Sequence, residues 1–128
     1  MGIKDKLHVM VVDDMSVSRG LILQALDWMG IQHVDYCVDG ESALRKLAAR
    51  PVHLVISDYN MPGMDGLTLL EGLRKGRTTQ RIGFILITGS TDAGLMERGN
   101  KLGMNNYIKK PFSPEALKGA IERVVGRL

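Results

Sequence analysis

Five short apolar runs, alternating with segments of helical periodicity, constrain the fold of this chain more than any other feature. The apolar runs cover residues 7–12, 33–38, 54–56, 84–87 and 106–109, and the helical segments cover 16–29, 41–49, 66–74, 91–102 and the residues after Ser113. Short runs rich in β-branched residues are typical of buried strands. Because a helix lies between each strand and the next, we predict an α/β fold, a doubly wound parallel sheet of five strands with five helices.

The length of 128 residues suits one domain with a substantial core and is short for two. No linker or repeat interrupts the alternation, so we expect a single domain over residues 1–128. The net charge of +3 is modest and evenly spread, which argues against nucleic-acid binding. No apolar run is long enough to cross a membrane. We therefore expect a cytoplasmic monomer without membrane insertion, and we expect its single cysteine, Cys37, to be a buried free thiol.

Polar residues end four of the five apolar runs. These are Asp13 and Asp14 after the first run, Asp58 after the third, Thr88 after the fourth and Lys109 in the fifth. In a flavodoxin-like sheet of order 2-1-3-4-5, the first and third strands are neighbours at the switch point where ligands bind. The three carboxylates are therefore expected to meet a hydroxyl and an ammonium group at one edge of the sheet.

Such a cluster of carboxylates has a specific chemistry. Like charges this close repel one another and require a counter-cation to remain ionised. Lys109 is expected to supply one positive charge and a hard divalent ion such as Mg²⁺ the rest. With that neutralisation, Asp58 can attack a phosphoryl group, and Thr88 and Lys109 can hold the phosphoryl oxygens. The residues alone thus predict a metal-assisted carboxylate site.

Several motifs then identify a family. They are Val-Asp-Asp at 12–14, Asp-Tyr-Asn-Met-Pro at 58–62, Met-Asp-Gly at 64–66, Thr88, and Lys-Lys-Pro-Phe at 109–112. With this spacing the chain resembles the receiver domains of two-component response regulators, and with Tyr107 it is most similar to the stand-alone chemotaxis (CheY-like) group, which has no output domain. The resemblance implies that Asp58 accepts a phosphoryl group from a histidine kinase or a phosphotransfer protein.

The resemblance also assigns roles around Asp58. Asp14, Asp58 and the backbone carbonyl of Asn60 would be direct Mg²⁺ ligands, and Asp13 would act mainly through water. Thr88 and Tyr107 would form the switch, and the peptide bond before Pro111 would be cis.

The implied function is a stoichiometric phosphoacceptor rather than an enzyme, acting on a partner such as the flagellar motor switch. A phosphate sink or a phosphorelay intermediate would use the same chemistry. A phosphohydrolase of small molecules is a further alternative, but Asn60 stands where haloacid-dehalogenase-like enzymes place a second Asp. A flavin carrier is weaker still, because acidic residues at the switch point would repel its phosphate.

Other polar residues are expected to have structural roles. Asp39 and Asp65 are interpreted as helix caps or solvated loop charges. The three histidines, His8, His33 and His53, lie on separate strands without the spacing of metal ligands.

Two helices carry further expectations. In the first helix, the pattern predicts that Leu21 faces the sheet and that Leu23 points outward, where it could contact a kinase. The fourth helix contains Gly94 and Gly99, which weaken it and make it a candidate for the element that changes on phosphorylation.

Overall fold

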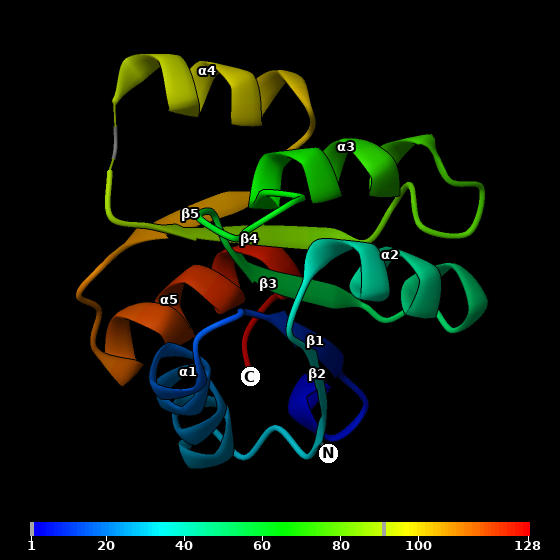
Figure 1. The fold of residues 1–128 in the computed structure, drawn as a ribbon. Helices are drawn as coiled ribbons and strands as arrows, with labels where there is room; N and C mark the ends of the chain where they lie inside the picture. The colour runs from blue at the N-terminus through cyan, green and yellow to red at the C-terminus, as the bar shows by residue number, and fades with distance from the viewer. Residues whose placement is uncertain (1, 91) are drawn as a thin grey trace.

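The computed structural model describes residues 2–90 and 92–128. A central parallel sheet separates two layers of helices (Figure 1). A short 3-10 helix, η1 (Ile3–Asp5), precedes the strands β1 (His8–Val12), β2 (His33–Cys37), β3 (Leu54–Asp58), β4 (Gly83–Thr88) and β5 (Asn106–Lys109), which alternate with the helices α1 (Ser16–Trp28), α2 (Gly40–Ala49), α3 (Gly66–Lys75), α4 (Ala93–Lys101) and α5 (Pro114–Val125).

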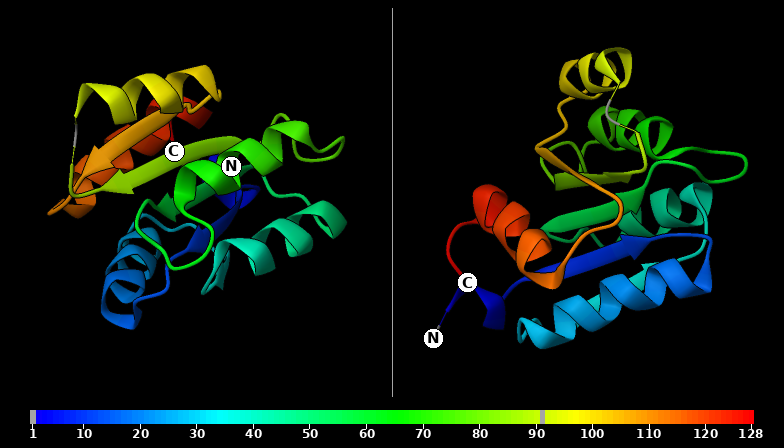
Figure 2. Two further views of the ribbon diagram at one scale, coloured as in Figure 1. Left: turned by 45° about the horizontal axis from the view of Figure 1, so that its top comes forward. Right: turned by 90° about the vertical axis from the view of Figure 1, so that its left-hand side faces the viewer.

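The order of the strands is β2-β1-β3-β4-β5, and every pair of neighbours is parallel, which confirms the predicted fold class and order. Helices α1 and α5 cover one face of the sheet, and α2, α3 and α4 cover the other (Figure 2). None of the helices in the described part of the chain is long and apolar enough to cross a membrane.

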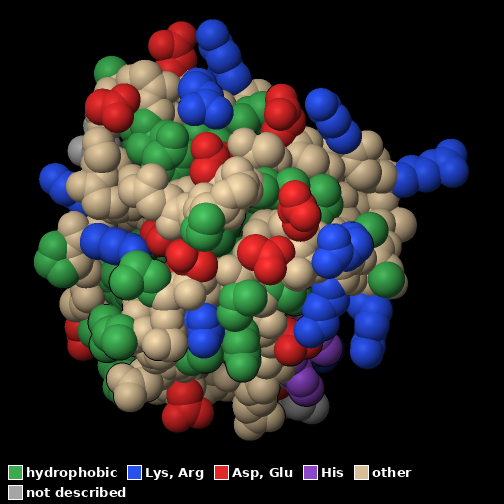
Figure 3. Space-filling model, in the orientation of Figure 1, with side chains coloured by type: hydrophobic (Ala, Val, Ile, Leu, Met, Phe, Trp, Pro, Cys, Tyr) green, Lys and Arg blue, Asp and Glu red, His purple; other side chains and the backbone are tan. Residues whose placement is uncertain are grey.

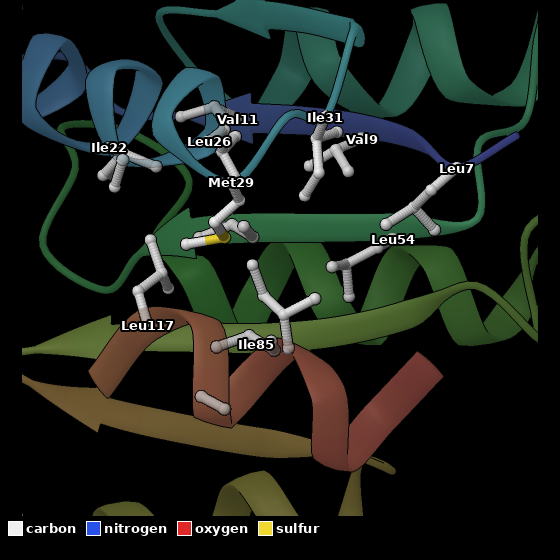
Figure 4. Close-up of a cluster of buried hydrophobic side chains, with 14 of the residues drawn as sticks. Leu7, Val9, Val11, Ile22, Leu26, Met29, Ile31, Leu54, Ile85 and Leu117 are labelled. Atoms are coloured by element: carbon white, nitrogen blue, oxygen red, sulfur yellow. The ribbon is translucent and has the colours of Figure 1, made fainter. Parts of the chain in front are cut away.

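Each face of the sheet has its own hydrophobic core, because successive side chains of a strand point to opposite faces. In β1, Val9 and Val11 pack against α1 and α5, whereas Met10 and Val12 pack on the side of α2 and α3. Figure 4 shows the first of these cores, with Val11 close to Leu26 of α1 and Val9 close to Ile31. All five residues of β3 are buried, as expected for the central strand of a sheet covered on both faces.

Side-chain caps begin several helices where the sequence indicated them. The carboxylate of Asp39 accepts a hydrogen bond from the Ser42 N–H at 2.7 Å, and that of Asp65 accepts one from the Thr68 N–H at 2.8 Å. Ser113 caps α5 by accepting from the Ala116 N–H at 3.1 Å. The interpretation of Asp39 and Asp65 as caps is therefore confirmed.

Three expected helix starts are wrong by one or two residues, and that of α2 is the simplest, since it begins at Gly40 rather than at residue 41. Ser16 is the first residue of α1 rather than its cap, and Met15 occupies the cap position without a side-chain hydrogen bond. The reason is that the Asp13 carboxylate accepts the Met15 N–H at 3.0 Å and so sets the start of the helix. Helix α4 begins at Ala93 behind an Asp92 cap, and Thr91, where the sequence placed its start, lies outside the described residues.

Candidate functional site

Three carboxylates meet at the carboxyl edge of the sheet, where the sequence placed them. Asp13 and Asp14 follow β1, and Asp58 ends β3, the strand that pairs with β1. Each side chain offers one oxygen, and these oxygens all lie within 4.8 Å of one another. Because β1 and β3 are parallel neighbours, their carboxyl ends open at the same edge, so adjacent strands bring together residues that are about 45 positions apart.

Two of these carboxylates are withdrawn from water. Asp13 is fully buried and Asp58 is 5% exposed, whereas Asp14 is exposed. One oxygen of Asp13 accepts the Met15 N–H, but the other, Oδ2, is buried without a hydrogen-bond partner among the described residues. An unpartnered buried carboxylate oxygen is costly unless a cation or water satisfies it. The Asp13 oxygen therefore indicates a position for a cation.

The electrostatics of Asp58 reflect its burial. Burial raises the pKa of the Asp58 carboxyl, the Lys110 ammonium group lowers it in part, and the neighbouring Asp13 carboxylate raises it further. A buried acid beside a second acid resists ionisation until positive charge is brought near. The ionised form that could act as a nucleophile thus depends on neighbouring cations.

Lys110 supplies one of those cations, since its Nζ lies 3.0 Å from Oδ1 of Asp58. The prediction that Lys109 holds this position is wrong. Within β5 the side chains alternate, and Ile108 packs into the core beneath α5, so Lys109 projects from the opposite face and is exposed. The alternation around Ile108 was the signal that could have separated the two adjacent lysines. The Lys110–Pro111 peptide bond is cis, as the resemblance implied.

Thr88 ends β4 one position beyond the level of Asp58, which is in register with Ile87. Its side chain is 1% exposed, and its Oγ1 donates to the Ser90 carbonyl at 2.9 Å and accepts from the Ser90 N–H at 3.0 Å. The hydroxyl is thus held by the loop that leads towards α4. Tyr107, on β5, is 42% exposed.

The loop after β3 folds back tightly over Asp58. Asn60 is exposed in this loop. Gly66 closes it, with its N–H donating to the Tyr59 carbonyl at 2.9 Å. A Cβ atom at Gly66 would lie 2.6 Å from the Asp58 carbonyl oxygen, so a side chain at this position would force the backbone apart. The close approach therefore requires glycine.

An apolar groove beside the site was not found from the sequence. It has a volume of about 770 Å³ and lies between α1 and the loop from β5 to α5. Its lining includes Leu21 and Trp28 of α1, together with Phe112 and Lys110. The expected orientation of α1 is wrong, because Leu21 is 57% exposed, whereas Leu23 is partly buried against the core.

The reason for this error is that Leu21 and Ile22 are adjacent, and Leu26 completes the buried stripe with Ile22 and Ala25. The helix is rotated from the expected orientation. Val17, Leu21 and Trp28 form a second, outward apolar stripe that the sequence pattern did not separate from the first.

The residues at the site fit a hard divalent cation. Ions such as Mg²⁺ are held by one or two carboxylates together with water and phosphate oxygens. Three carboxylate oxygens within 4.8 Å and the unpartnered Asp13 oxygen meet that requirement. With a cation there and Lys110 at Asp58, the arrangement can stabilise an incoming phosphoryl group beside a buried carboxylate nucleophile.

Comparisons with known proteins agree with this geometry. The family model described as the response regulator receiver domain matches residues 9–122. A probable chemotaxis protein CheY of Rhizobium etli is 41% identical over 128 residues, covering 100% of this chain and 99% of that protein. Chemotaxis protein CheY1 of Helicobacter pylori is 38% identical over 123 residues, covering 94% of this chain and 98% of that protein.

Solved structures give the same result. Chemotaxis protein CheY4 of Vibrio cholerae superposes with a TM-score of 0.86 at 29% identity, covering 92% of this chain and 98% of that chain. The receiver domain of a sensor histidine kinase of Pseudomonas aeruginosa, which has a magnesium ion coordinated in its active-site cleft, superposes with a TM-score of 0.85 at 26% identity, covering 94% and 98%.

Proposed function

This chain belongs to the response regulator receiver domain family, and from that premise we propose that Asp58 accepts a phosphoryl group from a histidine kinase or a phosphotransfer protein. The observation that carries this proposal is the environment of Asp58. Its carboxylate is buried at the carboxyl edge of the sheet, 3.0 Å from the Lys110 ammonium group and within reach of two further carboxylates. No other carboxylate in the described residues combines burial with an ion pair of this kind.

In the proposed reaction, an oxygen of Asp58 forms a bond to phosphorus as the bond between phosphorus and the donor nitrogen breaks. Lys110 then binds a phosphoryl oxygen in place of the free carboxylate, and the Thr88 hydroxyl exchanges its Ser90 partners for another phosphoryl oxygen. Asp13, Asp14 and Asp58, with the Asn60 carbonyl, would hold Mg²⁺, which supplies positive charge to the phosphoryl oxygens. The protein is a stoichiometric acceptor that assists its own phosphorylation and dephosphorylation.

The donor is proposed to dock in the groove along α1. The groove runs up to Lys110, which contacts Asp58, so a helix placed there would bring its phosphohistidine close to the acceptor. Leu21 and Trp28, each 57% exposed, provide apolar anchors on the groove. The proposed kinase contact thus lies on α1, as the sequence predicted, but it involves the outward apolar stripe that contains Leu21 rather than Leu23.

The output is proposed to be a change of binding surface that is read by the flagellar motor switch. The supporting observation is the similarity over the whole chain to chemotaxis proteins. Thr88 links the site to the loop before α4, so a move of its hydroxyl alters the start of that helix.

Incubation with acetyl phosphate and Mg²⁺ tests the acceptor. We expect the protein to gain one phosphoryl group, EDTA to prevent the gain, and Asp58→Asn to abolish it. Labelling of Asp58→Asn at the wild-type level would contradict the assignment. Continuous release of phosphate from small phosphate esters, over many turnovers, would instead indicate a phosphohydrolase.

A second assay addresses the output. The beryllofluoride-treated protein is expected to bind a flagellar motor-switch protein more tightly than the untreated protein. Rapid transfer from the kinase without any such binding would instead indicate a phosphate sink or a relay intermediate.

A further inference from the structure

The amino edge of the sheet, opposite to the phosphorylation site, carries all three histidines of the chain in one row. His8 of β1 is in register with His33 of β2. His53 directly precedes β3, whose Leu54 is in register with Val9, so it lies at the level of His8. Figure 3 shows histidine side chains (purple) at the lower right of the molecule. The row was not visible in the sequence, because it depends on the pairing of the strands.

Two of these rings are already in contact. His8 and His33 are stacked, with ring centroids 4.5 Å apart and planes inclined by 6°. Both residues are exposed, and neither ring is hydrogen-bonded to another residue in the described part of the chain. Their nitrogen lone pairs are therefore available to a ligand that reaches this edge.

His53 differs from the other two histidines. Its ring Nδ1 accepts the His8 backbone N–H at 3.0 Å, and the backbone N–H of His53 donates to the His8 carbonyl at 3.0 Å. Because Nδ1 acts as an acceptor, the proton of the neutral ring lies on Nε2. The ring of His53, 5.7 Å from that of His8, thus completes the hydrogen bonding of β1 and is not free as a ligand.

We propose that His8 and His33 form a site for a borderline divalent transition-metal ion such as Zn²⁺, Ni²⁺ or Cu²⁺. Imidazole nitrogen is a preferred ligand of these ions, whereas Mg²⁺ prefers oxygen. Tetrahedral Zn²⁺ with bonds of 2.0–2.1 Å places two ligand nitrogens about 3.3 Å apart. Rotation of two exposed, stacked rings about their side-chain bonds can bring one nitrogen from each to that separation.

The remaining coordination positions of the ion are taken by water. Asp35 lies on the same face of β2, two residues after His33, but it is paired with Lys46 at 3.5 Å. An ion held by His8 and His33 would tie the edge strand β2 to β1. It would lie at the end of the sheet remote from Asp58, so the two cation sites differ in both position and chemistry.

Zn²⁺ binding at pH 7.5, measured by calorimetry, tests this site. A large excess of Mg²⁺ is present throughout to occupy the carboxylates at the other edge. We expect one Zn²⁺ to bind, and His8→Gln and His33→Gln each to weaken the affinity at least tenfold. His53→Gln is the matched control, because its amide oxygen can still accept the His8 N–H, and we expect its affinity to remain within threefold of wild type.

All three positions are exposed, so the variants are expected to fold, and circular dichroism together with acetyl-phosphate labelling of Asp58 checks that they do. The proposal would be overturned if the wild-type protein bound no Zn²⁺ at a metal concentration of roughly 100 μM, which is the dissociation constant of a weak site. Equal affinity in the wild type and His33→Gln would also overturn it, since the ion would then be bound elsewhere. An equal loss in His53→Gln would overturn the assignment of His8 and His33 as the ligands.

Discussion

Helices α1 and α4 each follow a strand that carries site residues, but they are held to the protein very differently. Helix α1 buries Ile22, Ala25 and Leu26 and packs against α5. Its Arg19 also donates to the Asp13 carbonyl at 3.0 Å. Helix α4 buries only Leu95 and Gly99, and most of its other residues are exposed and polar.

This difference suggests a division of roles around one site. A firmly packed helix with an apolar outer stripe is suited to receive a partner without changing shape. A helix with few buried side chains opens at lower free energy and is suited to change when its first turn is disturbed. We infer that α1 receives the phosphodonor and that α4 transmits the result. The following variants test that division, in order of expected effect.

Lys110→Met is expected to have the largest effect. It removes the charge 3.0 Å from Asp58 and leaves a buried carboxylate without its partner. We expect phosphorylation by acetyl phosphate to slow by roughly a hundredfold, the usual effect of removing a group that stabilises charge in the transition state. Phosphate-affinity electrophoresis measures the rate. Lys109→Met is the matched control and should change the rate less than twofold. Equal slowing in both variants would show that the general positive charge matters rather than contact with Asp58.

Leu21→Asp tests the docking side. A charge on the groove should slow transfer from the phosphorylated kinase by about tenfold, the loss of one apolar anchor, while labelling by acetyl phosphate stays unchanged. Val38→Asp, at an exposed apolar residue that does not line the groove, is the control. If Leu21→Asp slowed labelling from both donors, the side chain would support the fold and not the docking of the kinase.

The sequence predicted the site residues well, except where two adjacent residues of the same kind point to different sides of a strand or helix. The strands and the three carboxylates followed from apolar runs and from the polar residues that end them, whereas the strand order came from the flavodoxin-like fold class. Lys109 and Lys110 are adjacent, as are Leu21 and Ile22, so composition alone could not assign which of each pair faces the site or the core. The pairing of His8 with His33 required the register of two strands, which no local pattern records.

The buried carboxyl group of Asp58 also makes the stability of the protein depend on pH. Burial raises the pKa of this carboxyl above its ordinary value of 3.8. The folded state therefore holds the proton more tightly than the unfolded state, and the free energy of unfolding falls as pH rises from 3.8 through the raised pKa. In EDTA, Asp58→Asn should thus have a melting temperature a few degrees higher than wild type at pH 7.

The same comparison below pH 3.8, where the wild-type carboxyl is protonated in both states, should show almost no difference. A lower melting temperature of Asp58→Asn at pH 7 would mean that the ion pair with Lys110 outweighs the cost of burial.

Glycine substitutions in α4 are expected to have the smallest effect, because they change only the stability of that helix. Gly94→Ala adds a Cβ that meets only an Asp92 carboxylate oxygen, at 3.4 Å, and should stabilise α4 by up to about 1 kcal/mol. Gly99→Ala is less clean, since its Cβ would lie 2.9 Å from the Met104 side chain. Gly20→Ala in α1, where a Cβ meets nothing within 4 Å, is the matched control. We expect Gly94→Ala to change the affinity for the output partner by up to about fivefold, the factor that corresponds to 1 kcal/mol, and Gly20→Ala to leave it unchanged.

Hydrogen exchange of the helix amides, followed by mass spectrometry with and without beryllofluoride and Mg²⁺, tests the division between α1 and α4 most directly. In the free protein we expect residues 93–101 of α4 to exchange fastest among the five helices, and the mimic to slow them. Residues 16–28 of α1 should change little. If α4 is as protected as α5 in the free protein and does not respond to the mimic, α4 is not the element that transmits phosphorylation, and the proposed division is wrong.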